Sequence, residues 1–301
     1  SQQMLIKQAL TPMKAANQGI QINLQKQFQT IDGFGYTLTG GSAQLIQALP
    51  ENERKKLLIE LFGTGENSIG ISVLRIAVGA SDLDASVFSY DDVPIGQRDE
   101  KLEQFSLKAS ENDLIPLLQA IKKVNPSIKL MATPWSPPAW MKDNQNSKGG
   151  SLLTQYYGIY AQYLVKYLKS MEAIGLSMDY LTPQNEPLHP GNNPSLLMLA
   201  SQQNDFIKNH LGPAFQKLGL NTKILAYDHN CDKPEYPLEI LNDPITRKYV
   251  AGSAFHLYNG DISALGTLRK AHPDKDVYFT EQWTGMKGDF AGDFNWHIKN
   301  V

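Results

Sequence analysis

MDYLTPQNEPLHP, residues 178–190, joins a short apolar segment to a carboxylate that prolines hold in place. Residues 178–184 are expected to form a buried strand, and Asn185 and Glu186 follow directly at its end. A carboxylate beside an amide, at the end of a buried strand, is typical of a site that cleaves sugars. A second carboxylate, Glu281, ends another apolar segment, VYFTE. We therefore expect Glu186 and Glu281 to face each other across a glycosidic bond.

Strand-like and helical patterns alternate along the rest of the chain. Apolar runs of strand length occur near residues 29–35, 68–78, 127–133, 178–184, 223–227, 250–257 and 276–280. Helical patterns are expected over residues 43–62, 112–124, 151–174, 195–210 and 262–271. This order predicts parallel strands joined by helical crossovers. No Gly-x-Gly-x-x-Gly follows the first strand, which disfavours a dinucleotide-binding fold.

Several helical segments carry signals for their limits and their packing. Pro50 divides the first of them, because proline suits the first turn of a new helix. The segment 151–174 has four tyrosines on one face, which predicts packing in the core rather than a ligand site: Tyr156, Tyr160, Tyr163 and Tyr167. The helix over 195–210 is expected to stop at Gly212 and Pro213.

Polar side chains gather just after the predicted strands, among them Arg75, Trp135, Glu186, His229, His256, Tyr258 and Glu281. In an eight-stranded barrel the active site lies at this end of the strands. Only seven strands can be counted, and residues 294–301 have a helical pattern. We expect an α/β fold, a (β/α)8 TIM barrel that lacks its last strand in this chain. The polar segment 81–110 is expected to be a long loop that shapes the substrate groove.

The composition excludes several classes of protein. The chain has 301 residues and 33.5 kDa, which suits one large α/β barrel better than a small single core. A net charge of −2 gives no broad field for nucleic acid, and no apolar run approaches the roughly 20 residues that span a bilayer. The single cysteine, Cys231, excludes an internal disulfide. The start lacks the pattern of a signal peptide, which indicates a mature or trimmed terminus.

The two glutamates suit the chemistry of glycoside hydrolysis. One carboxylic acid must protonate the leaving oxygen, so its pKa must be raised, while a second carboxylate stays ionised. The apolar, proline-rich surroundings of Glu186 suit the acid. Arg75 is expected to keep Glu281 ionised if the barrel brings their strands together. Asn185 can donate an amide hydrogen to a sugar hydroxyl.

Aromatic side chains and histidines leave other interpretations open. Trp135, Trp140 and Trp283 offer flat apolar faces for a pyranose ring. Arg75 could instead belong to a structural ion pair. His229 and His256 could be zinc ligands, although no acidic ligand stands at a typical spacing from them.

At this point the motifs resemble those of glycoside hydrolase family 30, which contains glucosylceramidases and β-1,6-glucanases. The resemblance extends from residue 31 to residue 296 and is carried by these motifs in order: IDGFG (31–35), LRIAVGASD (74–82), WSPPAWMK (135–142), QNEP (184–187), NDFI (204–207), LGP (211–213), LNDP (241–244), HLY (256–258) and TE (280–281). Together and in this order they are highly specific.

The resemblance implies a (β/α)8 barrel with a side β-sandwich and a reaction that retains anomeric configuration. Glu186 matches the acid/base of the family and Glu281 its nucleophile. The other matches are sugar-contacting or supporting positions: Arg75, Asp82, Trp135, Asn185, His229, His256 and Tyr258. It implies no metal or cofactor. Residues 1–28 match the first strands of the sandwich, and residues 29–301 match a barrel that is incomplete at its C-terminus.

Two local departures from the family concern the sugar pocket. Leu257 stands where glucosylceramidases carry tryptophan, and Gln282-Trp283 replaces smaller residues after the nucleophile, so Trp283 is expected to contact substrate. Family members also continue beyond this chain. We expect a further C-terminal segment, in the same or another polypeptide, to complete barrel and sandwich.

The expected function is therefore a retaining β-glycosidase that acts on β-glucosidic linkages. The expected substrate is β-1,6-glucan or a glucosylceramide-like glycolipid, and the expected location is extracytoplasmic: secreted, periplasmic or at the cell surface. Two alternatives remain. The chain could be a non-catalytic carbohydrate-binding remnant of such an enzyme, or a metal-dependent TIM-barrel hydrolase that uses His229 and His256.

Overall fold

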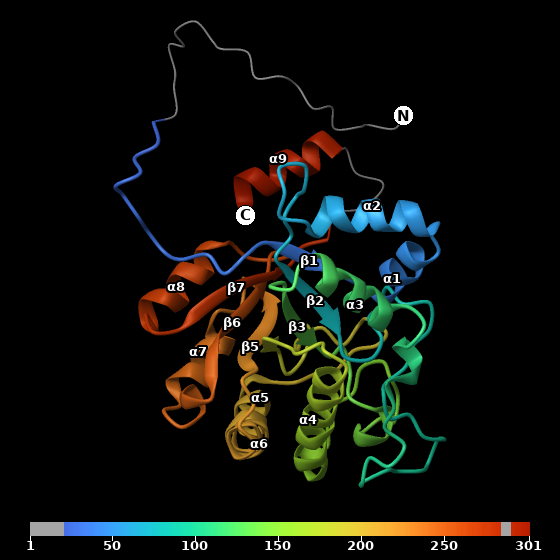
Figure 1. Cartoon of the computed structure of the whole chain (residues 1–301). Coiled ribbons are helices and arrows are strands. Elements are labelled where there is room, and N and C mark those ends of the chain that lie inside the picture. The colour runs from blue at the N-terminus through green and yellow to red at the C-terminus, as the bar shows by residue number, and fades with distance from the viewer. Residues whose placement is uncertain (1–20, 284–289) are drawn as a thin grey trace, which may run out of the picture. The chain divides into compact units, whose positions relative to one another are not determined.

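Parallel strands form one sheet in the order in which they occur along the chain (Figure 1). The computed structural model describes residues 21–283 and 290–301. Within them the sheet has seven strands: β1 (Gly35–Thr37), β2 (Val73–Ala77), β3 (Lys129–Thr133), β4 (Tyr180–Leu181), β5 (Lys223–Asn230), β6 (Val250–His256) and β7 (Asp276–Glu281). The two edge strands, β1 and β7, lie close together, so the sheet is a nearly closed barrel. The predicted α/β barrel is confirmed.

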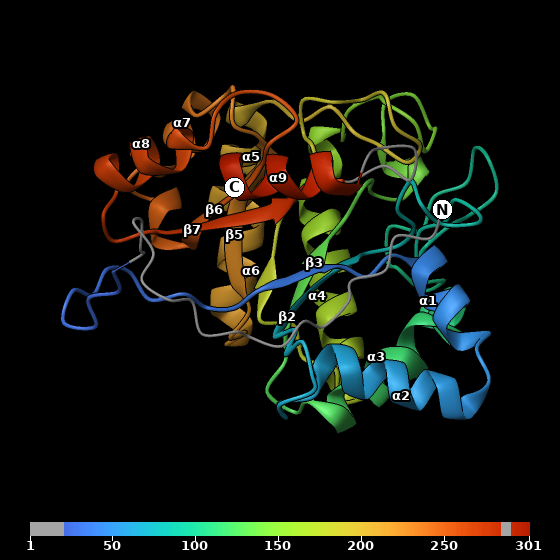
Figure 2. The ribbon, with the colours of Figure 1, turned by 90° about the horizontal axis from the view of Figure 1, so that it is seen from above.

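Helices follow the strands along the chain, and those of the barrel unit cover its outer side. Their bounds are α1 (Gly40–Gln47), α2 (Glu51–Phe62), α3 (Leu114–Val124), α4 (Tyr157–Ala173), α5 (Ala200–Phe206), α6 (Gly212–Leu218), α7 (Glu235–Asn242), α8 (Ser263–Ala271) and α9 (Phe290–Asn300). Figure 2 shows α1–α3 and α7–α8 on opposite sides of the strands. The barrel elements belong to one compact unit, Phe34–Trp283, whereas α9 belongs to a second unit. None of the described helices is long and apolar enough to cross a membrane.

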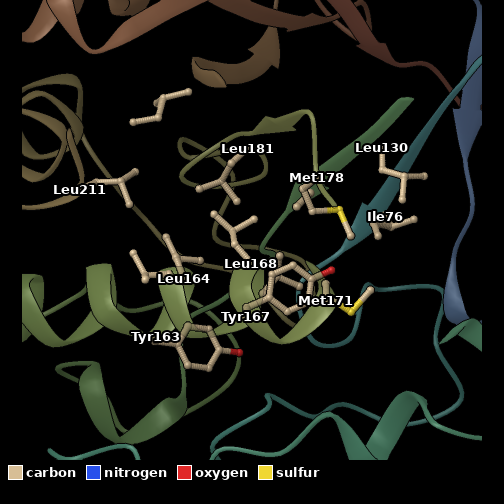
Figure 3. Packing of buried hydrophobic residues seen from close by; sticks show 14 of the residues in the cluster. Ile76, Leu130, Tyr163, Leu164, Tyr167, Leu168, Met171, Met178, Leu181 and Leu211 are labelled. Carbon is tan, nitrogen blue, oxygen red and sulfur yellow. The ribbon is translucent and has the colours of Figure 1, made fainter. Parts of the chain in front are cut away.

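The core is built around α4, as the tyrosine pattern predicts. Tyr160, Tyr163 and Tyr167 are completely buried, and Tyr156 is buried in the short 3₁₀ turn that precedes the helix. Figure 3 shows this helix directing apolar side chains toward those of the neighbouring strands, with Leu181 of β4 among them. Such burial is worth about 1.5–3 kcal/mol for each large apolar side chain. The tyrosine face is therefore structural.

Prolines lie in the first turns of two helices that the sequence patterns did not predict, α6 and α7. The helix expected to stop at Gly212 continues through a π-helical turn, Ile207–Leu211, into α6. Pro213 occupies the first turn of α6, where a missing N–H costs little. The helix α7 was not predicted, and Pro237 lies in its first turn, where proline is tolerated. Pro50 separates α1 from α2, as expected.

The N-terminal expectations are only partly covered by the described residues. The first barrel strand begins at Gly35, later than the predicted residues 29–35, and residues 21–34 contain no strand. Residues 1–20 lie outside the described part of the chain. The assignment of residues 1–28 to a side β-sandwich therefore stays a prediction. The long loop over 81–110 is observed, with one 3₁₀ turn at Leu107–Ser110.

Candidate active site

The polar residues predicted at the strand ends do meet at one end of the barrel. Arg75 lies on β2, Glu281 ends β7, and His256 ends β6. Asn185 and Glu186 follow β4 directly. Because all neighbouring strands are parallel, their carboxyl ends share one rim, which is where active sites of such barrels lie.

Glu281 is held by a cation and a hydroxyl. Arg75 Nη1 donates to Glu281 Oε2 at 2.7 Å, and Tyr258 Oη donates to Glu281 Oε1 at 3.0 Å. Arg75 is only 3% exposed, and its guanidinium lies over the ring of Trp135 at 4.8 Å from the centroid. A charge-assisted pair of this kind is stronger than a neutral hydrogen bond and fixes the orientation of the carboxylate. The predicted link between Arg75 and Glu281 is present.

Asp228 is the residue that sequence reasoning missed. It is completely buried on β5 and accepts hydrogen bonds from Arg75 Nη2 at 3.0 Å, Thr182 Oγ1 at 2.7 Å and Thr280 Oγ1 at 2.6 Å. Burial alone would raise the pKa of Asp228, but Arg75 and His256 hold it far below its ordinary value. Its only sequence signal is its place at the end of a predicted strand, in Asp228-His229-Asn230.

His256 bridges the buried aspartate and the predicted acid. Its Nε2 lies 3.0 Å from Asp228 Oδ1, and its Nδ1 lies 3.3 Å from Glu186 Oε1 and 3.8 Å from Glu281 Oε1. Burial lowers the pKa of His256, yet the charge of Glu281 and the bonds to Asp228 and Glu186 raise it to about 9. At neutral pH the ring is therefore a cation among three carboxylates.

Glu186 corrects an expectation. Its apolar, proline-rich sequence neighbourhood predicted a raised pKa. Burial does raise the pKa of Glu186, but the hydrogen bond and charge of His256, with the nearby His229 and His189, bring it below its ordinary value. His256 is remote in sequence, so the local sequence could not show this effect. Asn192 Nδ2 completes the surroundings, donating to Glu186 Oε2 at 3.3 Å.

The backbone at the site is unusual at three non-glycine residues. Glu186 has φ of 43°, Tyr227 of 79° and Asp228 of 71°, all in the left-handed region. Glu186 N donates to the carbonyl of Asp228 at 2.9 Å, so the two strained segments are bonded to each other. The register of β5 against β6 shifts between Tyr227 and His229. Strained backbone of this kind concentrates at functional sites.

Three further predicted residues are connected to this site: Asn185, Asp82 and Trp283. Asn185 Oδ1 accepts from Arg75 Nη2 at 2.6 Å. Asp82 lies in the long loop, and burial of its carboxyl group, together with the charges of Glu281 and Glu186, raises its pKa, so its carboxyl group interacts with the same site. Trp283 is 63% exposed, and its backbone N–H donates to Tyr258 Oη at 2.7 Å.

Two predicted pocket residues belong to the core instead. Trp140 is buried, donates its indole N–H to the carbonyl of Asp91 at 3.1 Å, and packs edge-on against Tyr156. Leu257 is also part of the buried apolar cluster. Neither side chain offers a face to a sugar, because the turn Ala139–Met141 and the end of β6 direct them inward.

In the zinc alternative the two histidines differ, because only His256 has both ring nitrogens close to carboxylates. Both ring nitrogens of His256 already face carboxylates, whereas a zinc ligand must offer a free lone pair. His229 Nε2 lies 4.0 Å from Glu186 Oε1, and burial lowers the pKa of His229 to about 4, which keeps it neutral. Among the described residues, Glu186, His256 and Glu281 are the ones whose ligand atoms all lie within 4.8 Å of one another. The charge of Arg75 beside Glu281 works against a cation there.

The chain matches a known family over most of its length. A model of the glycosyl hydrolase family 30 TIM-barrel domain matches residues 31–294. An endo-1,6-β-D-glucanase of Neurospora crassa is 39% identical over 267 residues, covering 86% of this chain and 55% of that protein. The lysosomal acid glucosylceramidase of Mus musculus is 33% identical, covering 89% of this chain and 55% of that protein. The chain thus spans about half the length of these relatives.

Solved structures give the same result. The endo-β1,6-glucanase BT3312 superposes with a TM-score of 0.82 and 35% identity, covering 88% of this chain and 60% of that one. SrfJ from Salmonella typhimurium superposes with a TM-score of 0.83 and 29% identity, covering 90% of this chain and 61% of that one.

Proposed function

Since the chain belongs to glycoside hydrolase family 30, we propose that it cleaves β-glucosidic linkages by a retaining double displacement. Glu186 is the general acid/base and Glu281 the nucleophile. The observation that carries this proposal is that oxygens of the two carboxylates lie within 4.8 Å of each other at one barrel rim. Retaining enzymes hold their carboxyl groups about 5–5.5 Å apart, whereas inverting ones need about 6.5–9.5 Å to admit a water.

The reaction divides between the two glutamates. In the first step an oxygen of Glu281 bonds to the anomeric carbon, the bond to the glycosidic oxygen breaks, and that oxygen takes a proton from Glu186. In the second step a water gives a proton to Glu186, and its oxygen displaces Glu281 from the anomeric carbon. Arg75 and Tyr258 suit Glu281 for this role, because their hydrogen bonds hold both of its oxygens in place.

The acid must gain a proton before the first step. In the free site the histidine ring carries the proton and Glu186 is ionised. His256 Nδ1 lies 3.3 Å from Glu186 Oε1, slightly beyond the distance for direct proton transfer, so the proposal requires this pair to move closer when substrate binds. Asp228 remains hydrogen-bonded to the other ring nitrogen and fixes the ring orientation.

The preferred substrate is β-1,6-glucan. Relatives described as endo-1,6-β-glucanases reach 39% identity, and a solved structure with that description superposes closely. A glucosylceramide-like glycolipid is the second candidate, supported by the glucosylceramidase at 33% identity. We also propose that the enzyme acts outside the cytoplasm, where such polysaccharides lie. Detection of the protein only in the cytoplasmic fraction of its native cells would contradict this location.

The test compares two substrates and two variants. Wild-type chain should release sugar from β-1,6-glucan, and NMR should show the β-anomer as the first product. Glu281→Gln should abolish turnover of every substrate. Glu186→Gln should slow glucan cleavage by about 10²–10⁴-fold while an activated aryl β-glucoside still forms the glycosyl-enzyme, since its leaving group needs no proton. Glu239→Gln, an exposed control, should behave as wild type.

Three outcomes would count against the proposal. An α-anomer as first product would indicate inversion. Full activity of the Glu281→Gln variant would show that Glu281 is not the nucleophile. Binding of glucan without any turnover by wild type would favour the carbohydrate-binding remnant.

A further inference from the structure

Lys142 is a buried cation in the loop that follows β3. Its side chain is 0% exposed, and Nζ donates to Ser136 Oγ at 3.0 Å, Ser147 O at 3.0 Å and Ser195 O at 2.7 Å. These three bonds use all three hydrogens of an ammonium group. No carboxylate of the described residues forms an ion pair with it. Burying a cation without a carboxylate partner costs free energy of folding, so the position of Lys142 needs a structural explanation.

The ammonium group joins two loops at the rim of the barrel. Ser136 and Ser147 belong to the loop after β3, which also carries Trp135, whereas Ser195 belongs to the loop after Glu186. The two loops are also bonded directly, since Ser195 N donates to Ser147 O at 3.0 Å. Lys142 therefore fixes the position of the loop that follows the acid/base relative to the loop that follows β3.

A short chain of hydrogen bonds continues from this point to the acid/base. Ser195, whose carbonyl receives the lysine, donates its Oγ to the carbonyl of Asn192 at 2.6 Å. Asn192 Nδ2 in turn donates to Glu186 Oε2 at 3.3 Å. The other oxygen of Glu186 faces His256. Asn192 therefore holds Glu186 Oε2, the carboxylate oxygen that does not face His256.

We propose that Lys142 is a positioning residue for the acid/base, acting through Ser195 and Asn192, which holds Glu186 Oε2, to fix the orientation of the carboxyl group that protonates the glycosidic oxygen. The inference rests on the proposed function of Glu186. Burial lowers the pKa of Lys142 to about 7, which reflects the cost of keeping a charge there. A neutral amine would have two hydrogens for three acceptors, so one of the two loops would lose a bond.

The experiment separates positioning from general loop stability by its dependence on the leaving group. The variants are Lys142→Met, which keeps the length of the side chain, and Asn192→Ala, which removes the last bond of the chain. Lys148→Met, an exposed lysine of the same loop, is the control. Each is assayed on β-1,6-glucan, where departure of the leaving group needs a proton, and on the burst of dinitrophenolate from a dinitrophenyl β-glucoside, where it does not.

We expect Lys142→Met and Asn192→Ala to lower kcat on glucan by about 10–100-fold, a part of the 10²–10⁴-fold that general acid catalysis supplies. The burst rate should change by less than about three-fold in both, and Lys148→Met should match wild type. Equal losses on the two substrates, or no loss on glucan, would overturn the positioning role.

Three further outcomes are also decisive. If Lys142→Met does not fold, Asn192→Ala decides alone, and a loss confined to glucan supports the proposal while its absence refutes it. If wild type cleaves neither substrate, the proposed function fails, and the positioning role fails with it. A wild type active on both substrates with unselective variants leaves the proposed function standing and refutes only the role of Lys142.

Discussion

Asp91 is a carboxyl group whose proton should govern stability, and replacing it with asparagine tests this directly. Its side chain is completely buried, and the carboxyl group of Asp99 lies beside it. Burial and the charge of Asp99 raise the pKa of Asp91 to about 7, from an ordinary value of 3.8. The folded protein therefore keeps a proton between about pH 4 and pH 7 that the unfolded chain releases.

The size of the change in unfolding free energy follows from this pH range. Stability falls as pH rises wherever the folded state binds more protons, by about 1.4 kcal/mol per pH unit for one proton. Three units of pKa difference correspond to about 4 kcal/mol lost by pH 8. Asparagine has nearly the shape of the protonated acid and no charge to bury. The stability advantage of Asp91→Asn over wild type should therefore grow by about 3 kcal/mol between pH 5 and pH 8.

Urea unfolding followed by tryptophan fluorescence measures this difference at each pH, provided that refolding is complete. Glu100→Gln, an exposed change of the same chemical kind in the same loop, is the control and should stay parallel to wild type. A constant difference between Asp91→Asn and wild type from pH 5 to pH 8 would refute the reasoning. It would mean that Asp91 is ionised in the folded protein throughout this range.

Two further predictions concern the site. Asp228→Asn removes the charge that faces His256, so unfolding free energy should fall by about 3–5 kcal/mol and the pKa of His256, followed by NMR, should drop from about 9; an unchanged pKa would contradict the assigned pairing. Trp140→Phe loses one indole hydrogen bond, so the free energy of unfolding in urea should fall by about 1 kcal/mol while KM stays unchanged. Trp283→Ala should instead raise KM and leave the free energy of unfolding unchanged, because this side chain is exposed. A raised KM with unchanged stability in Trp140→Phe would indicate that Trp140 contacts the sugar.

The barrel and most of its rim were predictable because they follow from alternation alone. Once strands and helices alternate, every strand ends at the same rim, so Arg75, Glu186 and Glu281 had to come together although they are far apart in sequence. The prediction needed only that each residue stand at a strand end. It did not depend on the bounds of any strand, several of which were observed to be shorter.

The predictions that were wrong or missing depended on the direction of a side chain or on residues that are distant in sequence. Trp135 and Trp140 stand in one motif, but a 3₁₀ turn directs the second into the core, and no periodicity marks that turn. Asp228 lies where β5 departs from regular strand geometry, so the period of two that assigns faces no longer applies. The pKa of Glu186 is lowered chiefly by His256, which is 70 residues away. Local composition cannot report any of these effects.

The left-handed backbone at Glu186, Tyr227 and Asp228 has a consequence for protein engineering. Copying the side chains of this site onto another barrel would not reproduce it, because ordinary strand ends would aim the same carboxylates elsewhere. The unit that must be grafted is the pair of backbone segments joined by the bond from Glu186 N to Asp228 O. Glycine at these positions would relieve the strain and delete the chemistry, so selection for stability alone should tend to erode this site rather than improve it.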